Sequence, residues 1–469
     1  MGYIFFRDIR NKGGNKVGKL AAVILAAGQG TRMKSDLPKV LFPLAGKPIL
    51  QHVVDMLVRV GVEKTIIVVG HGSQQVKEQI QGDITWVEQH PQLGTGHALF
   101  QARDELAGYS GDVLVLCGDA PLLTPQTVTD LVAAHRDSAA DATVLSALMD
   151  DPTGYGRILR EKSGNVKAIV EQRDASEQHL EIKEINSGSF CFQWQAAVDK
   201  LASLDKDNSQ GEYYLTDIIS SIHRSGGKVE AFPVSDSSEV MGINDRVQLA
   251  AAEKIIRRRI NAGLMYDGVT IVDPDTTWID ADVRVGRDSV ILPNTHIKGK
   301  TQAGENCKIG PDSFIEDCVL GQEVIIRNSV AEESSIGDKT SVGPYAYIRP
   351  GCTIGRGVRI GDFVELKKAR IGDGSKVPHL SYVGDALVGS GVNIGCGVIT
   401  ANYDGHKKHI TDIGDEAFIG SNSNLVAPLK IGARAYVAAG STINRDVPEG
   451  SLAIARSRQS VKENWRRKD

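Results

Sequence analysis

The sequence predicts an α/β protein with a doubly wound, Rossmann-like sheet in its N-terminal half, a connecting helix, and a parallel β-helix in its C-terminal half. Three observations lead to this prediction. An aliphatic residue returns at every sixth position between Ile279 and Ile443. Short apolar runs alternate with helical stretches from Leu20 onward, and a segment rich in strong helix formers lies between the two halves.

A period of six fits neither an α-helix nor an alternating β-strand, because side chains on one face repeat every 3.6 residues in a helix and every 2 in a strand. In a hexapeptide repeat each hexad supplies one short strand and a turn, and stacked coils align their aliphatic residues. The period is broken at 320–328 and again at 400–413. The second interruption carries a polar run, 401–409, which must loop out of the coil and which we expect to line a site.

The composition restricts the class of partner. The 469 residues carry a net charge of -4 and 24% charged residues, so nucleic acid is a poor candidate while small anionic ligands stay open. Six cysteines without C-x-x-C spacing argue against a disulfide framework and a zinc site, and predict a reduced, cytoplasmic protein. No apolar run approaches the roughly 20 residues that a membrane-spanning helix needs.

Phosphate-binding features follow two of the predicted strands. The apolar run 20–25 leads directly into the small-residue loop 26–32, whose backbone N–H groups can approach phosphates while Arg32 adds charge. Lys39 could reach the same phosphates or could be a solvated surface lysine. Asp119, at the carboxyl end of a second apolar run, could hold Mg²⁺ or cap a helix.

The segment between the halves predicts a long helix that Asn244 or Asp245 caps. Its arginine run, Arg257-Arg258-Arg259, is expected to be a solvated face rather than a nucleic-acid patch, because no basic surroundings accompany it.

Several short motifs occur in one order along the chain. They are the loop 25–33, Leu37-Pro38-Lys39, Gln89 with 93–98, Gly118-Asp119, Gly154-Tyr155-Gly156-Arg157, Ile169-Val170-Glu171, Glu184-Ile185-Asn186 and 242–245. In this order, and followed by the hexad region, they resemble the nucleotidyltransferase half of the bacterial bifunctional N-acetylglucosamine-1-phosphate uridylyltransferases/glucosamine-1-phosphate acetyltransferases. The resemblance covers essentially all of residues 20–460.

This resemblance implies a Mg²⁺-dependent transfer of UMP from UTP to N-acetylglucosamine 1-phosphate. The implied nucleotide and sugar-phosphate residues are Leu25, Ala26, Ala27, Gly28, Arg32, Lys39, Gln89, Gly94, Thr95, Cys117, Gly118, Asp119, Gly156, Glu171, Asn186 and Asn244. Among them, Gln89, Gly94 and Thr95 would read uracil, whereas Gly156, Glu171 and Asn186 would hold the N-acetylglucosamine. Asp119 and Asn244 would bind the metal, and Cys117 stands where the family often has a tyrosine.

The hexad region resembles the acetyltransferase half of the same family. His379 is the expected general base, because an imidazole with an ordinary pKa near 6.5 can take a proton from an amine at neutral pH. By itself a histidine on a coil is more commonly a solvated corner residue. The implied glucosamine-1-phosphate residues are Arg349, Lys367, Tyr382, Asn393 and Lys408. The implied acetyl-CoA residues are Cys396, Asn402, Tyr403, Ser421, Ala439 and Arg456, with Cys396 in a place that is often alanine.

The resemblance also implies a left-handed β-helix, a homotrimer with sites between the rods, and a role in making peptidoglycan and lipopolysaccharide precursors. The expected parts are a flexible leader (1–19), a uridylyltransferase domain (20–244), a linker helix (245–266), an acetyltransferase β-helix (267–455) and a basic tail (456–469) that is solvated or contacts CoA phosphates. A monofunctional nucleotidyltransferase and a non-catalytic assembly subunit are the alternatives. The His379 and Asn402-Tyr403 motifs disfavour the first, and Arg32, Lys39 and Asp119 disfavour the second.

Overall fold

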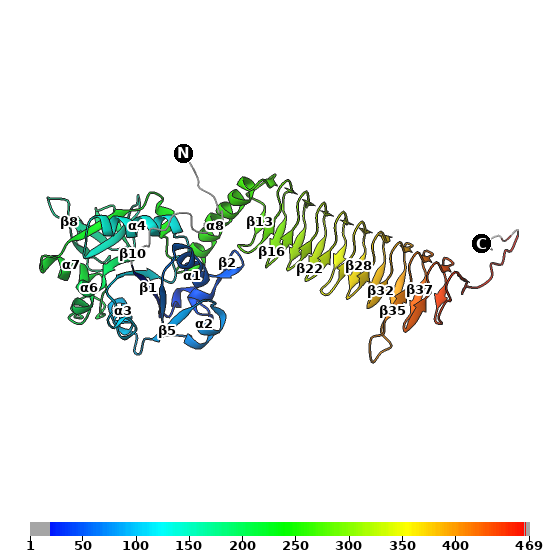
Figure 1. Ribbon diagram of the computed structural model, residues 1–469, viewed down its shortest axis with the longest axis horizontal. Helices are drawn as coiled ribbons and strands as arrows, with labels where there is room; N and C mark the ends of the chain where they lie inside the picture. The colour runs from blue at the N-terminus through cyan, green and yellow to red at the C-terminus, as the bar shows by residue number, and fades with distance from the viewer. Residues whose placement is uncertain (1–18, 464, 466–469) are drawn as a thin grey trace. The chain divides into compact units, whose positions relative to one another are not determined.

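The computed structural model describes residues 19–463 and residue 465. These residues form two compact units that divide at Arg257 (Figure 1). All but the last residue of the expected leader, and residues 464 and 466–469 of the expected basic tail, lie outside the described residues. Among the described helices, none combines the length and the hydropathy that crossing a bilayer requires.

The N-terminal unit is built on a mixed sheet with the order β11-β7-β10-β6-β1-β4-β5, with β8 beside β10 and β9 beside β8. The strands are β1 (Leu20–Ala26), β4 (Lys64–Val69), β5 (Ile84–Glu88), β6 (Asp112–Cys117), β7 (Ala142–Leu148), β8 (Arg157–Arg160), β9 (Val166–Val170), β10 (Glu184–Gln193) and β11 (Val229–Pro233). The helices are α1 (Ile49–Val60), α2 (Ser73–Gln79), α3 (Thr95–Gln101), α4 (Pro125–Asp137), α5 (Glu177–Leu180), α6 (Trp194–Leu201) and α7 (Asp217–Arg224). The central strand β1 pairs in parallel with β4 and β6, so their carboxyl ends meet at one edge.

Helices cover both faces of this sheet, which explains why β1 is apolar throughout. Ala22 and Ile24 face a core shared with α1 and α4. Ala21 and Val23 face a second core shared with α3, α6 and α7. A parallel strand buried on both sides reads as a continuous apolar run, as the sequence predicted. The doubly wound arrangement is therefore confirmed.

The connecting helix α8 spans Arg246–Tyr266. Asp245 is the residue that caps it, because its Oδ1 accepts the backbone N–H of Gln248 at 2.8 Å. Near its other end Asn261 donates to the carbonyls of Pro274 and Thr277 at 2.9 and 3.0 Å. These bonds join the helix to the first coil of the C-terminal unit.

One member of the arginine run contradicts the expected solvated face. Arg257 is only 6% exposed, and its guanidinium carbon lies 3.8 Å from the centre of the Trp278 ring. Arg258 instead pairs with Asp275 at 3.3 Å on the exposed side. The prediction failed at Arg257 because an aromatic ring 21 positions away offers a guanidinium a stacking surface that local charge patterning cannot reveal.

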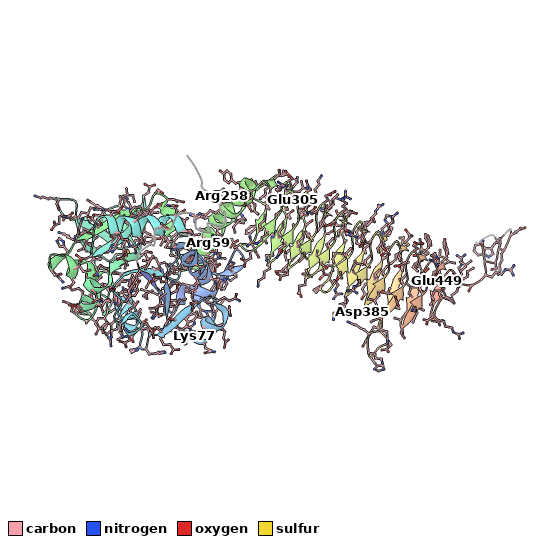
Figure 2. All side chains as sticks on the ribbon, in the orientation of Figure 1. Arg59, Lys77, Arg258, Glu305, Asp385 and Glu449 are labelled. Atoms are coloured by element: carbon pink, nitrogen blue, oxygen red, sulfur yellow. The ribbon has the colours of Figure 1, made fainter. Side chains whose placement is uncertain are left out.

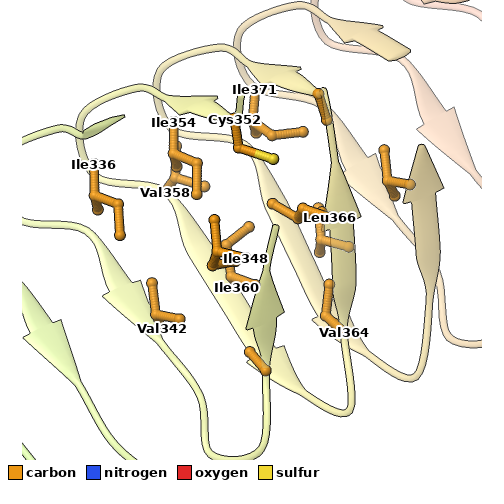
Figure 3. Packing of buried hydrophobic residues seen from close by; sticks show 14 of the residues in the cluster. Ile336, Val342, Ile348, Cys352, Ile354, Val358, Ile360, Val364, Leu366 and Ile371 are labelled. Carbon is orange, nitrogen blue, oxygen red and sulfur yellow. The ribbon is translucent and has the colours of Figure 1, made fainter. Parts of the chain in front are cut away.

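The C-terminal unit is a left-handed parallel β-helix with three flat faces. The first face runs from β12 (Thr270–Ile271) to β41 (Leu452–Ala453), the second from β13 (Trp278–Ile279) to β40 (Thr442–Ile443), and the third from β14 (Arg284–Val285) to β38 (Leu429–Ile431). Each of the recurring aliphatic residues points inward, as Figure 3 shows for Ile348, Ile360 and Leu366. Each hexad of the six-residue period therefore forms one face of a coil.

The two interruptions of the period have different structures. At 320–328 no loop leaves the coil: β20 (Val319–Leu320) and β21 (Ile325–Ile326) stay in their faces, and the corners are shortened. At the second interruption the chain leaves the coil after β34 (Ile399–Ala401) and returns at β35 (Thr411–Ile413). The resulting loop, residues 402–410, projects beside β35 in Figure 1, as the sequence predicted.

Truncating one inward residue is expected to weaken the β-helix. Ile360 is fully buried between Val342 and Val377 of the neighbouring coils, so Ile360→Ala should lower the free energy of unfolding of this unit by about 2–5 kcal/mol. Urea denaturation followed by far-UV circular dichroism measures the change. The outward neighbour Arg359→Ala is the control and should change it by less than about 0.5 kcal/mol; equal effects would mean that the interior is not the source of stability.

Candidate active sites

The first site lies at the carboxyl ends of β1 and β6. The N–H of Gly118 donates to the carbonyl of Leu25 at 2.9 Å, which joins the two loops that follow these strands. Gly30 has a φ of 64°, and a Cβ there would lie 2.6 Å from the Cβ of Lys39. The loop therefore passes Lys39 so closely that only glycine fits at position 30.

Three predicted residues converge on one point of this site. The ammonium of Lys39 contacts the carboxylate of Asp119 and donates to Oδ1 of Asn244 at 3.0 Å. Both oxygen ligands come from loops far apart in sequence and are held together by the bond from the N–H of Ile243 to the carbonyl of Asp119, 2.9 Å long. A carboxylate and an amide oxygen thus face the same cation.

The residues expected to read uracil form a tight local structure. Gln89 follows β5, is 2% exposed, and places its amide nitrogen 2.9 Å from the carbonyl of Gly94 and 3.0 Å from Nδ1 of His97. The hydroxyl of Thr95 accepts the N–H of Leu215 at 3.1 Å. His97 is a residue that the motif analysis did not single out, although it lies inside the same motif. Gln89 therefore fixes the loop through its amide nitrogen.

The residues expected to hold the sugar also lie together. The N–H of Asn186 donates to the carbonyl of Gly156 at 2.8 Å, and a Cβ at Gly156 would lie 3.3 Å from the Glu171 carboxylate. Thr216 donates to that carboxylate at 3.1 Å. Burial nevertheless raises the pKa of Glu171 above its ordinary value.

A cavity of about 530 Å³ connects the phosphate side with the sugar side. Its lining includes Arg32, Gly154, Glu171, Gln172 and Gln210. A cavity lined by both a guanidinium and a carboxylate can hold a ligand that carries phosphate and sugar hydroxyls.

Cys117 ends β6, close to the same site. Burial raises the pKa of its thiol to about 12, so the group is protonated at neutral pH. The thiol lies 3.5 Å from the carbonyl of Gly188. Its side chain therefore packs against that backbone and is not a nucleophile.

The second site is on the β-helix, where β27 (Arg359–Asp362) and β30 (Lys376–His379) lie one coil apart on the first face. The register places Asp362 directly beside His379, and Nδ1 of the imidazole lies 2.7 Å from Oδ1 of the carboxylate. The hydrogen bond from His379 lowers the pKa of Asp362. The sequence motifs did not point to Asp362. The signal that could have identified it is its separation from His379 by 17 residues, which is one coil.

Four of the six residues expected to bind acetyl-CoA extend from His379 as a column along one corner of the rod: Cys396, Ser421, Ala439 and Arg456. Backbone N–H groups link successive coils, from Gly397 to the carbonyl of Leu380, from Asn422 to Cys396, and from Gly440 to Ser421, over 2.7–2.8 Å. The guanidinium of Arg456 donates to the carbonyl of Ala439 at 2.9 Å and ends the column. Four steps of ~4.8 Å between coils give the column a length of about 19 Å, which suits an extended ligand.

A second group of predicted residues lies at the next corner. Lys367 ends β28 (Glu365–Lys367), and its ammonium is 3.8 Å from Asp385, which follows β31 (Tyr382–Gly384). The amide of Asn402 donates to the same carboxylate, and Asp385 lies where the loop leaves the coil (Figure 2). Hydrogen bonding from Lys367 and the charge of Lys367 lower the pKa of Lys408. The ammonium groups of Lys367 and Lys408 are therefore close enough to affect each other's charge at this corner.

Not every predicted residue joins these groups. Arg349 does lie one coil from Lys367, since its N–H donates to the carbonyl of Leu366 at 2.9 Å and its guanidinium pairs with Glu365 at 2.8 Å. The phenol of Tyr403 instead donates to the carbonyl of Gly405 at 2.7 Å within the loop. Asn393 lies on the first face beside Lys376, whereas the Lys367 corner belongs to the second face. Within the described residues of one chain, Asn393 thus lies on a different face from the Lys367 corner.

The chain is similar to known transferases in both units. Residues 22–182 match the family described as MobA-like NTP transferase domain, and residues 333–368 match the bacterial transferase hexapeptide (six repeats). The bifunctional protein GlmU of Geobacillus sp. (strain WCH70) is 54% identical, with 95% of this chain and 97% of that protein aligned. GlmU of Shouchella clausii is 52% identical over 96% of this chain and 99% of that one. GlmU of Listeria innocua serovar 6a is 48% identical, with 95% of this chain and 97% of that protein aligned.

Proposed function

The chain belongs to the family of bifunctional GlmU proteins, and we propose that its two units carry the two reactions in series. The β-helix acetylates glucosamine 1-phosphate with acetyl-CoA, and the N-terminal unit transfers UMP from UTP to the product with release of pyrophosphate. The observation that carries the proposal for the β-helix is that His379 heads the column of expected acetyl-CoA residues.

The donor set of Asp119 and Asn244 fits a hard cation. The ammonium of Lys39 already acts as a stand-in cation between them, which means that their oxygens lie close enough to share one ion. Mg²⁺ prefers such oxygen ligands and usually completes its coordination with water and substrate phosphates. We therefore propose that Asp119 and Asn244 hold Mg²⁺, which when bound offsets charge on the triphosphate.

The uridylyl transfer needs positioning and charge neutralisation more than acid–base chemistry. A sugar phosphate is already an anionic nucleophile, so the protein must align it with the α-phosphorus and offset charge on the departing pyrophosphate. The loop 25–28 and Arg32 are the proposed phosphate contacts, and Lys39 would add a positive charge there. Glu171 and Asn186 are the proposed sugar contacts, and the cavity that Arg32 and Glu171 line supports this assignment.

The acetyl transfer requires a base. The amine of glucosamine attacks the thioester carbonyl, loses its proton to Nε2 of His379, and the CoA sulfur leaves and takes up a proton. Lys367 and Lys408 are the proposed contacts for the 1-phosphate, because an anion that binds between two neighbouring ammonium groups offsets their repulsion. Asp362 would keep the imidazole proton on Nδ1 and leave Nε2 free to act as the base.

Replacing that carboxylate tests the orientation of the base. Asp362→Asn should lower kcat for acetyl transfer by about 10–10²-fold, because the amide can donate to Nδ1 and favour the wrong tautomer. The pKa of Asp362 is lowered in the folded chain, so the carboxylate is ionised at every pH above its ordinary pKa. Its orienting effect on His379 is lost only as the pH falls through this lowered pKa. The ratio of wild-type to variant kcat should therefore stay constant over about pH 6–9. A kcat equal to that of the wild type would show that Asp362 does not orient His379.

A homotrimer is the proposed assembly. Asn393 lies on the first face and Lys367 on the second within one chain, so a neighbouring copy would complete the site. Tyr345 and Phe363 also stack at 5.5 Å on the surface of the rod while 60% and 58% exposed, which is typical of a surface that another chain covers. All six cysteines are free, in agreement with the proposed location in the reducing cytoplasm.

Product analysis tests the whole proposal. Purified protein is incubated with glucosamine 1-phosphate, acetyl-CoA, UTP and Mg²⁺, with one component omitted at a time, and the products are identified by mass spectrometry. We expect N-acetylglucosamine 1-phosphate without UTP and its UDP-sugar when all four are present. Failure to acetylate glucosamine 1-phosphate would contradict the role of the β-helix, and failure to release pyrophosphate from UTP and N-acetylglucosamine 1-phosphate would contradict that of the N-terminal unit.

A further inference from the structure

The loop 402–410 carries Lys408, but the β-helix itself gives the tip of the loop little support. The backbone closes as a short hairpin through the bridge between Tyr403 and Lys408 and the bond from the N–H of His409 to the carbonyl of Asn402, 2.7 Å long. An isolated two-stranded hairpin is marginally stable in water. The ammonium of Lys367 lowers the pKa of Lys408, and the Asp385 carboxylate offsets only part of this effect. The loop gains further support from its own side chains.

Asp404 and His409 supply that support. Oδ1 of Asp404 accepts the backbone N–H groups of His406 and Lys407, both at 2.8 Å, which fixes the turn at the tip. Oδ2 of Asp404 lies 2.6 Å from Nε2 of His409, across the base of the loop. The His409 side chain is only 20% exposed, although its neighbours His406 and Lys407 are exposed. One carboxylate thus ties the tip to the residue next to Lys408.

We propose that Asp404 and His409 form a positioning pair that holds Lys408 against Lys367 and so prepares the site for the phosphate of the acetyl acceptor. The proposal rests on the proposed function, since it takes the Lys367 corner as the phosphate site. Ordering the loop before the substrate arrives removes an entropic cost from binding, because the two cations are already in place. The pair contacts the loop and not the reacting atoms, so its effect appears in binding of the acceptor.

The chain offers a matched control for the test. His406 lies on the same loop and bonds to Asp404 through its backbone N–H, so His406→Ala keeps that bond. His409→Ala removes the ring that contacts Asp404. His409→Gln restores a side-chain donor for the same carboxylate.

The experiment measures KM and kcat for acetyl transfer with glucosamine 1-phosphate as the varied substrate in all three variants of the full-length chain. In His409→Ala, KM should rise about tenfold while kcat falls by less than about threefold, as expected when one charge-assisted hydrogen bond that acts on binding is lost. His409→Gln should recover most of the affinity, and His406→Ala should match the wild type. Uridylyl transfer should be unchanged in every variant, which shows that the N-terminal unit is intact, and a nearly unchanged kcat for acetyl transfer shows that the β-helix is folded.

Hydrogen–deuterium exchange gives an independent measurement on the same proteins. Amides of residues 402–410 should exchange faster in His409→Ala than in His406→Ala, because the loop opens more often. An unchanged KM in His409→Ala overturns the proposal whether or not exchange is faster. Equal exchange in the two variants overturns it as well. Absence of acetyl transfer in the wild type would be a failure of the proposed function, and is distinct from either result.

Discussion

His379→Ala is expected to lower kcat for acetyl transfer by about 10²–10⁴-fold, the range that removal of a general base produces. The attacking amine must lose a proton, and His379 is the group that heads the acetyl-CoA column. Pyrophosphate release from UTP and N-acetylglucosamine 1-phosphate should stay within about twofold of the wild type, because the residues proposed for that reaction lie in the other compact unit. CoA release is followed with a thiol reagent, and pyrophosphate with a coupled phosphate assay.

His406→Ala is the control for the loss of a histidine from the β-helix, and both reactions should proceed normally. Loss of both activities in His379→Ala would contradict two independent sites. Retained acetyl transfer would mean that another group takes the proton from the amine.

Asp119→Ala is expected to produce the converse result. Uridylyl transfer should fall by about 10²-fold or more, because the variant removes the one carboxylate of the proposed Mg²⁺ site and leaves Lys39 without its anionic partner. Acetyl transfer should continue at the wild-type rate. Rates are measured as pyrophosphate release over a range of Mg²⁺ concentrations, and Asp119→Asn, which keeps one oxygen ligand, should need more Mg²⁺ to reach half its maximal rate.

Asp130→Ala is a matched control, since Asp130 contacts Gln126 on the exposed face of α4. It should leave both reactions unchanged. Binding of Mn²⁺ to the protein, measured by electron paramagnetic resonance, should weaken in Asp119→Ala but not in Asp130→Ala. Wild-type uridylyl transfer in Asp119→Ala would show that the metal and the triphosphate are held elsewhere.

Much of the fold follows from periodicity in the sequence. Ile348, Ile360 and Leu366 could be assigned to an interior because a six-residue period has one structural solution, a coil with one hexad per face. The strand β1 could be assigned to the centre of a sheet because it is apolar on both sides. Such patterns are local and repeat, so a single chain is enough to recognise them.

The features that the sequence did not reveal depend on contacts between distant residues. Asp362 was missed because a coil of 17 residues brings it to His379, and the length of each coil varies at its corners. Arg257 was expected in solvent but stacks on Trp278. The contact of Lys39 with Asp119 joins residues 80 positions apart and depends on how two loops meet at the end of the sheet. The patterns that predict the fold repeat along the chain, whereas each of these contacts occurs once and joins two distant residues.

The stacking of Asp362 beneath His379 limits how this rod can change in evolution. A solenoid tolerates the gain or loss of a whole turn, because each turn contacts only its neighbours and the interior remains continuous. A turn inserted between β27 and β30 would leave such a rod well packed yet move the carboxylate a further ~4.8 Å from the imidazole, beyond hydrogen-bonding reach. Duplications are thus acceptable toward the N-terminal end of the rod, before the proposed site residues, while the stretch between Asp362 and His379 has a fixed length.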